Sequence, residues 1–488
     1  MNKSVKMLTN SSILLLYTIF EIIALFLFNV FSARFLGVEG FGRLIYIISY
    51  VLLFSSLADM GTSLGITKCV ARNSSSKSNY INAGFTLRLI MSVIFVITTN
   101  SSFLIFGKGE DIFLILVLSL AEASRGIAIY IAFIFRGVER MVYEPLFFGM
   151  DRLIMLVFGL LVLNAGYGID ELIIVISIAR ISSLILAIFF YSRNFGRVRL
   201  SSSKAFLNDL WKESYPVAMV MFSDKLSVYL PPVLLTTFWE STATGLFQSS
   251  YKIALFPILI CTILIQSIYP SIVSCFAASD KDSITDLYHF ATKMLLNIVL
   301  PCFVIFLAFS EDILSFIYGK DYLEAAWALK AMTPYILLVA VLSMSMHFLL
   351  AIDRQRVVAK IAIYTTVVSI MINFFLIFIL GLKGAVLALS FVSGISSAVY
   401  ILTVQRLGYQ AFKLKDNFSQ IISSFAMFSI VYCLSNTLKI QGLLFIAWTS
   451  LLGLATYIFV LMFTGGISQR EKAMVKELFN KIAIIKGT

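Results

Sequence analysis

The chain has 488 residues, of which 60% are hydrophobic and only 13% are charged, and its formal net charge is +12. A hydrophobic content this high excludes a soluble multidomain protein and indicates a polytopic membrane protein. The excess of lysine and arginine does not indicate a nucleic-acid partner, because these residues cluster in the loops between apolar segments, where membrane topology signals occur.

Apolar windows of about 20 residues mark the expected transmembrane helices, since a helix of that length crosses the hydrocarbon core of a bilayer. About fourteen such windows follow one another, so the chain is predicted to be all-α. The first is too long for the core of a signal peptide, and we expect it to remain as the first span. The predicted bounds are 12–33, 42–66, 83–106, 112–135, 145–167, 170–191, 215–238, 246–275, 290–310, 328–352, 357–380, 384–404, 418–437 and 442–463.

Basic residues between the spans predict the orientation of the chain. If both ends are cytoplasmic, about 25 basic residues lie inside and about 7 outside, which satisfies the positive-inside rule. The outside segments are short and often acidic, as in Asp170-Glu171. We therefore expect both termini on the cytoplasmic side.

The two halves of the chain resemble each other at a period of about 200 residues, which is typical of an internal structural repeat. Phe106-Gly107-Lys108 before the fourth span matches Tyr318-Gly319-Lys320 before the tenth. Gly42 and Gly245 likewise open the second and eighth spans. Because each repeat has an even number of spans, we expect two pseudo-repeated six-helix lobes in the same orientation around a central cavity.

The repeat also predicts the domain boundaries. The N-terminal lobe is expected at 1–200 and the C-terminal lobe at 205–408. Residues 414–488 would add two extra C-terminal helices and a basic tail on the anionic inner leaflet, for which a merely solvated tail is the alternative.

Ionisable side chains inside the predicted spans are unusual, because each costs free energy unless it faces protein or water. Away from the ends of the spans, aspartate, glutamate, lysine and arginine lie in the first eight spans and are essentially absent from the later ones, so we expect the first lobe to carry a polar cavity wall that the second lacks. These residues are Glu21, Asp59, Arg88, Glu122, Arg125, Asp151, Arg152, Arg180, Asp224, Lys225 and Lys252.

Two kinds of site follow from these charges. Arginine suits a diphosphate because its planar guanidinium makes paired charge-assisted hydrogen bonds, whereas a carboxylate suits a coupling cation. The residues assigned to substrate binding in the cavity are Arg125, Arg180, Arg88 and Lys225. The residues assigned to cation coupling are Glu21, Asp59, Glu122 and Asp224.

Structural roles are the alternative for several of these residues. Glu122 and Arg125 are three residues apart and are placed to form an internal ion pair on one helix. Asp59 is also placed to end the second span. Arg88, Asp151 and Arg152 lie near cytoplasmic ends, from which a long side chain reaches the interface, and the neighbours Asp224 and Lys225 point about 100° apart.

Cysteine and histidine do not indicate a metal site. The five cysteines have no paired spacing, and His289 and His347 are isolated in the sequence. We therefore expect no metal and no cofactor, apart from a proton or sodium ion that drives transport.

Several short motifs together resemble the Wzx-type polysaccharide flippases of the multidrug/oligosaccharidyl-lipid/polysaccharide exporter superfamily. They are the stretch 33–42, Leu57-Ala58-Asp59-Met60-Gly61 and Val70-Ala71-Arg72, with Tyr318-Gly319-Lys320-Asp321-Tyr322 resembling the second lobe of that family. Only the Asp59 motif carries over residue by residue, since the cavity charges vary among members.

The resemblance implies a transporter rather than an enzyme. It would move an undecaprenyl-diphosphate-linked repeat unit of O-antigen, capsule or a similar polymer across the bacterial inner membrane by alternating access, coupled to a cation. A polysaccharide polymerase and a chain-length regulator are the implied protein partners, beside the lipid bilayer.

Alternatives stay open from the sequence. A multidrug or small-molecule cation antiporter shares the fold, and a flippase for a peptidoglycan precursor or teichoic-type polymer differs only at the sugar end. An O-antigen polymerase or ligase would need a large outside loop with catalytic residues, whereas the longest outside loops here have about 15–20 residues.

Overall fold

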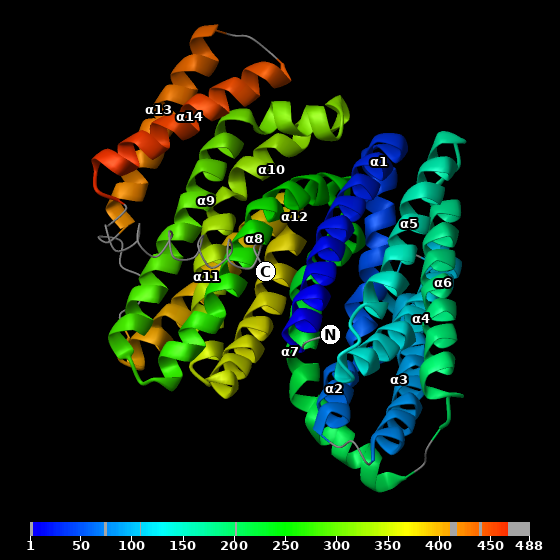
Figure 1. Cartoon of the computed structure of the whole chain (residues 1–488). Helices are drawn as coiled ribbons and strands as arrows, with labels where there is room; N and C mark the ends of the chain where they lie inside the picture. The colour runs from blue at the N-terminus through cyan, green and yellow to red at the C-terminus, as the bar shows by residue number, and fades with distance from the viewer. Residues whose placement is uncertain are drawn as a thin grey trace. The chain divides into compact units, whose positions relative to one another are not determined.

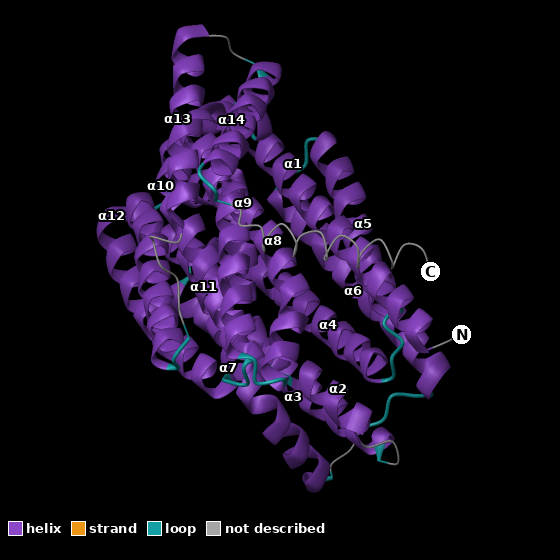
Figure 2. Ribbon diagram, turned by 60° about the vertical axis from the view of Figure 1, so that its left-hand side comes forward, coloured by secondary structure: helices purple, strands orange, loops and turns teal. Residues whose placement is uncertain are grey.

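The computed structural model describes residues 3–72, 76–107, 109–200, 203–409, 417–438 and 442–466. In these ranges the secondary structure is helices joined by short turns and loops, with no strand, as the ribbon coloured by secondary structure shows (Figure 2). Helices suit an apolar chain because they satisfy every backbone hydrogen bond within one segment. The helices are α1 (Lys3–Asp59), α2 (Thr62–Arg72), α3 (Lys77–Phe106), α4 (Ile112–Gly137), α5 (Tyr143–Asn164), α6 (Ile169–Phe195), α7 (Lys204–Phe238), α8 (Ser241–Ala277), α9 (Lys281–Ile317), α10 (Ala326–Ala331), α11 (Thr333–Ala351), α12 (Gln355–Arg406), α13 (Phe418–Leu438) and α14 (Leu443–Phe463).

Twelve segments of the described chain are long and apolar enough to cross a membrane, as a multi-pass membrane protein requires. Two of them, Leu16–Arg72 with 57 residues and Gln355–Arg406 with 52, far exceed the length of a single crossing. Each contains a glycine outside helical geometry, with φ 70° at Gly37 and φ 55° at Gly381. Because a right-handed helix cannot pass through positive φ, Gln355–Arg406 is two helices joined end to end. Leu16–Arg72 is three, since it also passes the turn at Met60-Gly61 that separates α1 from α2.

Contacts divide the chain into two compact units, which are described separately. The first comprises Met1–Gln248 and Ala362–Ala385, and the second comprises Ser249–Ile361 and the described residues from Val386 onward. The predicted lobes, 1–200 and 205–408, stay a prediction.

The first unit contains α1 to α7, and Figure 1 shows α1 to α6 in blue to teal. Its largest core is rich in aromatic residues, and the rings of Tyr50 and Phe103 meet edge to face with their centroids 4.9 Å apart. α7 joins this core through Leu226, Tyr229 and Val233. Although α7 follows the first predicted lobe, 1–200, it packs on α1.

The second unit contains α9, α10, α11, α13, α14 and the larger parts of α8 and α12. α13 and α14 pack against each other and on α9 around Leu296, Met427 and Val431. The Tyr457 hydroxyl on α14 donates a hydrogen bond to Asn297 Oδ1 at 2.9 Å. The two extra C-terminal helices expected from the sequence are therefore anchored to this unit, whereas the basic tail lies outside the described residues.

The Tyr318-Gly319-Lys320 motif forms the turn that follows α9. Gly319 has φ 107°, a conformation that favours glycine, while the rings of Tyr318 and Tyr322 are buried 5.3 Å apart. The Ser250 hydroxyl then fixes the turn by donating to the Ala325 carbonyl at 2.8 Å. This motif is therefore a packing element of the second unit.

Candidate functional site

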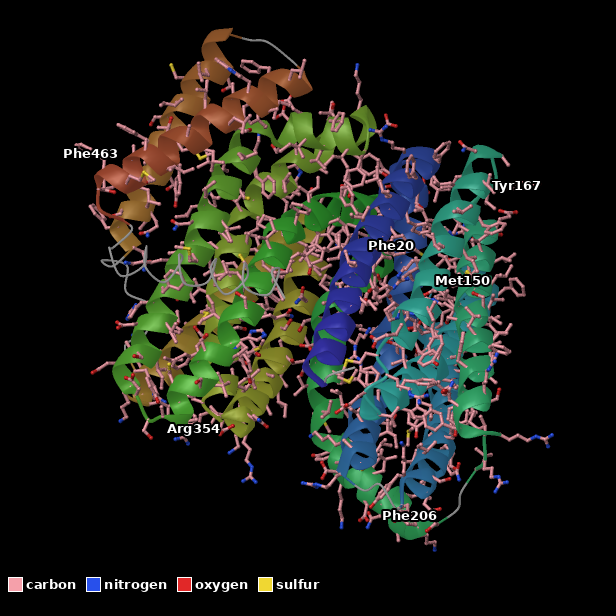
Figure 3. The ribbon with its side chains drawn as sticks, in the orientation of Figure 1. Phe20, Met150, Tyr167, Phe206, Arg354 and Phe463 are labelled. Carbon is pink, nitrogen blue, oxygen red and sulfur yellow. The ribbon has the colours of Figure 1, made fainter. Side chains whose placement is uncertain are left out.

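Six charged side chains from four helices of the first unit form one continuous series of ion pairs, which we call the charge chain. In spatial order they are Glu21, Arg152, Asp151, Arg125, Glu122 and Arg180. Figure 3 draws the side chains of these helices, and the labelled Phe20 and Met150 mark the turns of α1 and α5 that carry Glu21 and Asp151.

Glu122 lies between two arginines at one end of the charge chain. Its Oε2 atom is 2.9 Å from Arg180 Nη1 on α6, and its Oε1 atom is 3.8 Å from Arg125 Nη1, one turn along α4. The local pairing with Arg125 that the sequence suggests thus exists, but the shorter contact is with a residue from another helix. The Glu122 carboxylate therefore ties α4 to α6.

Asp151 and Arg152 on α5 continue the charge chain toward α1. Asp151 Oδ2 is 3.4 Å from Arg125 Nε and 3.5 Å from Arg152 Nη1. Arg152 in turn donates two hydrogen bonds to Glu21 Oε1, from Nη2 at 2.8 Å and from Nε at 3.2 Å. Both α5 residues are therefore fixed inside the protein.

The charge chain lies deep within its helices. Glu122 and Arg180 are about 15 Å from the first residues of α4 and α6 at 1.5 Å per residue, which is about half the thickness of a 30 Å hydrocarbon core. The Asp151 side chain is 1% exposed, and those of Glu122 and Arg180 are 7% and 8% exposed. Arg125 and Glu21 are more open, at 19% and 27%.

Hydrogen bonding at the centre of the charge chain is incomplete in the structure. Four buried atoms of these ion pairs make no hydrogen bond of good geometry: Glu122 Oε2, Arg125 Nε, Asp151 Oδ2 and Arg180 Nη1. A buried charged atom without a hydrogen bond is costly and calls for a specific explanation. These four atoms are held by ion-pair contacts with one another, Arg125 Nε with Asp151 Oδ2 and Arg180 Nη1 with Glu122 Oε2.

Lys225 on α7 gives the site its net charge. Three arginines and three carboxylates of the charge chain balance, and the Lys225 ammonium adds one positive charge. The charges of Glu122, Arg125 and Arg180 act on it, and the Lys225 Nζ atom lies 5.2 Å from the centre of the Tyr229 ring. Among the described residues, no carboxylate lies within 4.0 Å of Lys225.

Asp59 and Arg88 form a separate buried pair. Arg88 Nη1 donates to Asp59 Oδ1, and Arg88 Nη2 donates to the Gly126 carbonyl. Asp59 Oδ1 also accepts from the Ser63 hydroxyl at 2.7 Å. This pair joins α1, α2, α3 and α4, and the substrate and coupling roles predicted for its two members would require it to open.

The remaining predicted residue, Asp224, is exposed beside the half-buried Lys225. Within the described ranges it makes no ion pair. Lys252 belongs to the second unit and is not part of the charge chain. No group of three or more His, Cys, Asp or Glu residues in the described part of the chain could hold a metal ion.

Asp151 and Arg152 are central residues that the sequence interpretation left outside the assigned sites. They were expected near a cytoplasmic end, where a long side chain escapes to the interface. In the structure α5 begins at Tyr143, which places Asp151 more than two turns inside the helix. The distance of Asp151 from the start of its helix is the feature of the sequence that could have indicated burial.

Comparison with known proteins identifies relatives of this chain. The family described as "Polysaccharide biosynthesis protein" matches residues 7–276. The probable low-salt glycan biosynthesis flippase Agl15 of Haloferax volcanii is 19% identical over 220 residues, which are 44% of this chain and 46% of that protein. The match thus spans less than half of the relative's length.

Two solved structures share the fold. The lipid II flippase MurJ in an inward closed conformation superposes with a TM-score of 0.76 and 16% identity, over 92% of this chain and 98% of that one. An inward-facing multidrug resistance MATE family transporter of the MOP superfamily superposes with a TM-score of 0.67 and 15% identity, over 79% and 94%. At these identities the similarity shows the fold.

Proposed function

The chain belongs to the polysaccharide biosynthesis protein family, and on that premise we propose that it is a flippase for a lipid-linked oligosaccharide. Its substrate is an undecaprenyl-diphosphate-linked repeat unit of O-antigen, capsule or a similar polysaccharide. The protein moves this lipid from the cytoplasmic to the periplasmic leaflet of the bacterial inner membrane by alternating access. The relative named as a glycan biosynthesis flippase supports this assignment.

The single observation that carries the proposal is the group of buried arginines in the charge chain, to which the nearby Lys225 adds one positive charge. A diphosphate taken through the membrane loses its water, and only charged donors in the protein can compensate that loss. Arg125 and Arg180 offer guanidinium groups whose ion pairs at Nε and Nη1 lack a hydrogen bond of good geometry, and Lys225 adds the net positive charge. Guanidinium groups bind phosphate oxygens in paired hydrogen bonds.

The carboxylates of the charge chain have a role of their own in this mechanism. Without substrate, Glu122 is the counter-ion of Arg180 and Arg125. A diphosphate that takes over these arginines leaves the Glu122 carboxylate without a cation, so it binds the coupling proton or sodium ion. One charge crossing 100 mV supplies about 2.3 kcal/mol, enough to bias the conformational cycle.

The proposed architecture follows from the two glycine breaks. Divided at Gly37 and Gly381, the twelve apolar segments become fourteen crossings, an even number that leaves both termini on the same side. The excess of basic residues in the loops on that side supports the cytoplasm. The expected arrangement is two six-helix lobes around a central cavity, followed by α13 and α14. A polysaccharide polymerase and a chain-length regulator act on the product after it crosses, and nucleic acid has no part in the cycle.

A multidrug or small-molecule cation antiporter is the second candidate. It is favoured by the equal number of acids and arginines in the charge chain and by the partial exposure of Glu21, which suits a cationic substrate. The two candidates differ in the charge of the transported molecule. Export of a cation would depend on Glu21 and Glu122, whereas flipping of a diphosphate would depend on Arg125 and Arg180.

Deletion of the gene in its host tests the proposal. Electrophoresis of surface polysaccharide and mass analysis of lipid-linked oligosaccharide should show lost polymer and complete repeat units retained on the cytoplasmic leaflet. Repeat units that reach the periplasm unpolymerised would identify a polymerase instead. Unchanged polysaccharide with altered drug sensitivity would assign the protein to multidrug export.

A further inference from the structure

A cavity of about 220 Å³ lies between α2, α3 and α7 of the first unit, away from the helix positions of the charge chain. Its polar lining is Lys68 and Arg72 from α2, Tyr80 from α3, and Asp209, Lys212 and Glu213 from α7. At about 30 Å³ per molecule, this volume corresponds to roughly seven waters. The cavity is thus large enough for a small polar group.

Helical spacing produces the two charged walls of this cavity. Lys68 and Arg72 are four residues apart, so both project from one face of α2. Asp209, Lys212 and Glu213 are at positions i, i+3 and i+4 of α7 and likewise share a face. The α2 wall is therefore purely cationic, and the α7 wall carries both signs.

The ion pairs across the cavity are loose. Glu213 is 3.9 Å from Lys68 Nζ and 3.6 Å from Arg72 Nη1, longer than a direct hydrogen bond. The Lys68 and Arg72 side chains are 62% and 79% exposed. Their N–H donors therefore remain accessible to a ligand.

The level of the cavity indicates where such a ligand comes from. The span predicted from the sequence for this helix is 215–238, so Glu213 lies two residues, about 3 Å at 1.5 Å per residue, before its start. This is the depth of lipid headgroups, and under the topology proposed above it is on the cytoplasmic side. Basic pockets between transmembrane helices at this level are suited to lipid phosphates.

The charges of the cavity select a ligand that carries both signs. An anion alone would meet the carboxylates of Asp209 and Glu213, and an ammonium alone would meet the three cations. We propose that the cavity binds the phosphoethanolamine headgroup of a phospholipid in the cytoplasmic leaflet. The phosphate pairs with Lys68, Arg72 and Lys212, and the ammonium pairs with Asp209.

Tyr80 lies beside the carboxylate that receives the ammonium. The charge of Asp209 acts on the Tyr80 hydroxyl, and the Tyr80 ring packs edge to face on Phe206 with the ring centroids 4.9 Å apart. A bound headgroup would thus contact α2, α3 and α7 at the same time and hold the three helices together. Binding to the folded protein stabilises it in proportion to the lipid concentration.

The test measures the unfolding temperature of the purified full-length protein in detergent during lipid titration. Phosphatidylethanolamine should raise the unfolding temperature saturably, at a concentration at least about tenfold below that of phosphatidylglycerol, which lacks the cation. Phosphatidylcholine, whose ammonium has no N–H donor, should also be weaker. An equal or stronger effect of phosphatidylglycerol would overturn the proposal, as would equal effects of all three lipids.

Two variants distinguish the two halves of the site. Arg72→Ala should weaken binding of phosphatidylethanolamine about tenfold, and Asp209→Asn should remove the preference for phosphatidylethanolamine over phosphatidylglycerol. Arg193→Ala, an exposed cation on α6 outside the cavity, is the control and should change neither. Unchanged selectivity in Asp209→Asn would contradict the assignment.

Free phosphoethanolamine provides the last arm of the test. Because the lipid tails add apolar contacts, the soluble headgroup should bind much more weakly than the lipid. Tighter binding of the soluble compound would reject a bilayer lipid as the source. The outcome does not depend on the transported substrate, so it is independent of the proposed flippase function.

Discussion

Gly42 lies directly against the backbone at Gly245: a Cβ atom built on Gly42 would be 2.8 Å from the Gly245 nitrogen and would overlap the Ser241 carbonyl. The contact is reciprocal, since a Cβ atom on Gly245 would overlap the Val38 carbonyl. These are the two glycines that open the second and eighth predicted spans. The start of α8 therefore meets α1 just past the Gly37 break at a distance that only glycine permits.

Gly42→Ala should lower the unfolding temperature of the purified protein and reduce export. The added methyl group meets backbone atoms that cannot rotate away, so we expect a loss of about 1–3 kcal/mol. Gly149→Ala on α5 is the control, because nothing lies within 4 Å of its added Cβ atom. Equal unfolding temperatures for the two variants would show that the contact at Gly42 is not tight in the native protein.

Much of the fold could be predicted because it depends on short, contiguous stretches of the sequence. The membrane class and the family are confirmed. The breaks at Gly37 and Gly381 fall between neighbouring predicted windows, 12–33 and 42–66, then 357–380 and 384–404. Hydrophobic windows and glycine are local signals, so a single sequence reveals them.

The pairing of charges could not be predicted because it depends on which helices meet. Arg88 pairs with Asp59 from 29 residues earlier, and Arg180 pairs with Glu122 from 58 residues earlier. For Glu122 the sequence suggested only the local partner Arg125, three residues along the same helix. Ion pairing between helices is decided by tertiary packing, so the roles assigned to these residues stay predictions.

Neutralising one partner of the Asp59–Arg88 pair should destabilise the first unit strongly. Asp59→Asn leaves a buried guanidinium without its carboxylate, which costs about 3–5 kcal/mol, whereas Asp59→Asn with Arg88→Gln should recover most of that loss. Unfolding temperatures of wild type, both single variants and the double variant measure the coupling. Additive losses would show that the two side chains do not interact in the folded protein.

Lys225→Gln should weaken substrate binding without unfolding the protein. Lys225 supplies the net positive charge of the site and has no carboxylate within 4.0 Å among the described residues, so no buried anion is left behind. We expect about a tenfold higher KM for a fluorescent undecaprenyl-diphosphate-linked sugar in vesicles, with an unchanged unfolding temperature. Lys204→Gln, at the exposed start of α7, is the matched control. An unchanged KM would remove Lys225 from the site.

Variants of Arg180 and Glu122 can distinguish two roles of Arg180, substrate binding and pairing with Glu122. Arg180→Gln leaves the buried Glu122 carboxylate with only the 3.8 Å contact to Arg125, so we expect both lost export and a stability loss of about 3–5 kcal/mol. Adding Glu122→Gln removes the unpaired charge and should restore most of the stability.

Measuring polysaccharide export by the Arg180→Gln, Glu122→Gln double variant shows whether Arg180 binds the diphosphate or only pairs with Glu122. If Arg180 binds the diphosphate, the restored protein still lacks a guanidinium donor and exports no polysaccharide, although its amount in the membrane is normal. Arg193→Gln on the exposed end of α6 should leave export unchanged. Normal surface polysaccharide in the double variant would mean that Arg180 serves only as the counter-ion of Glu122, and the diphosphate site would then have to lie elsewhere.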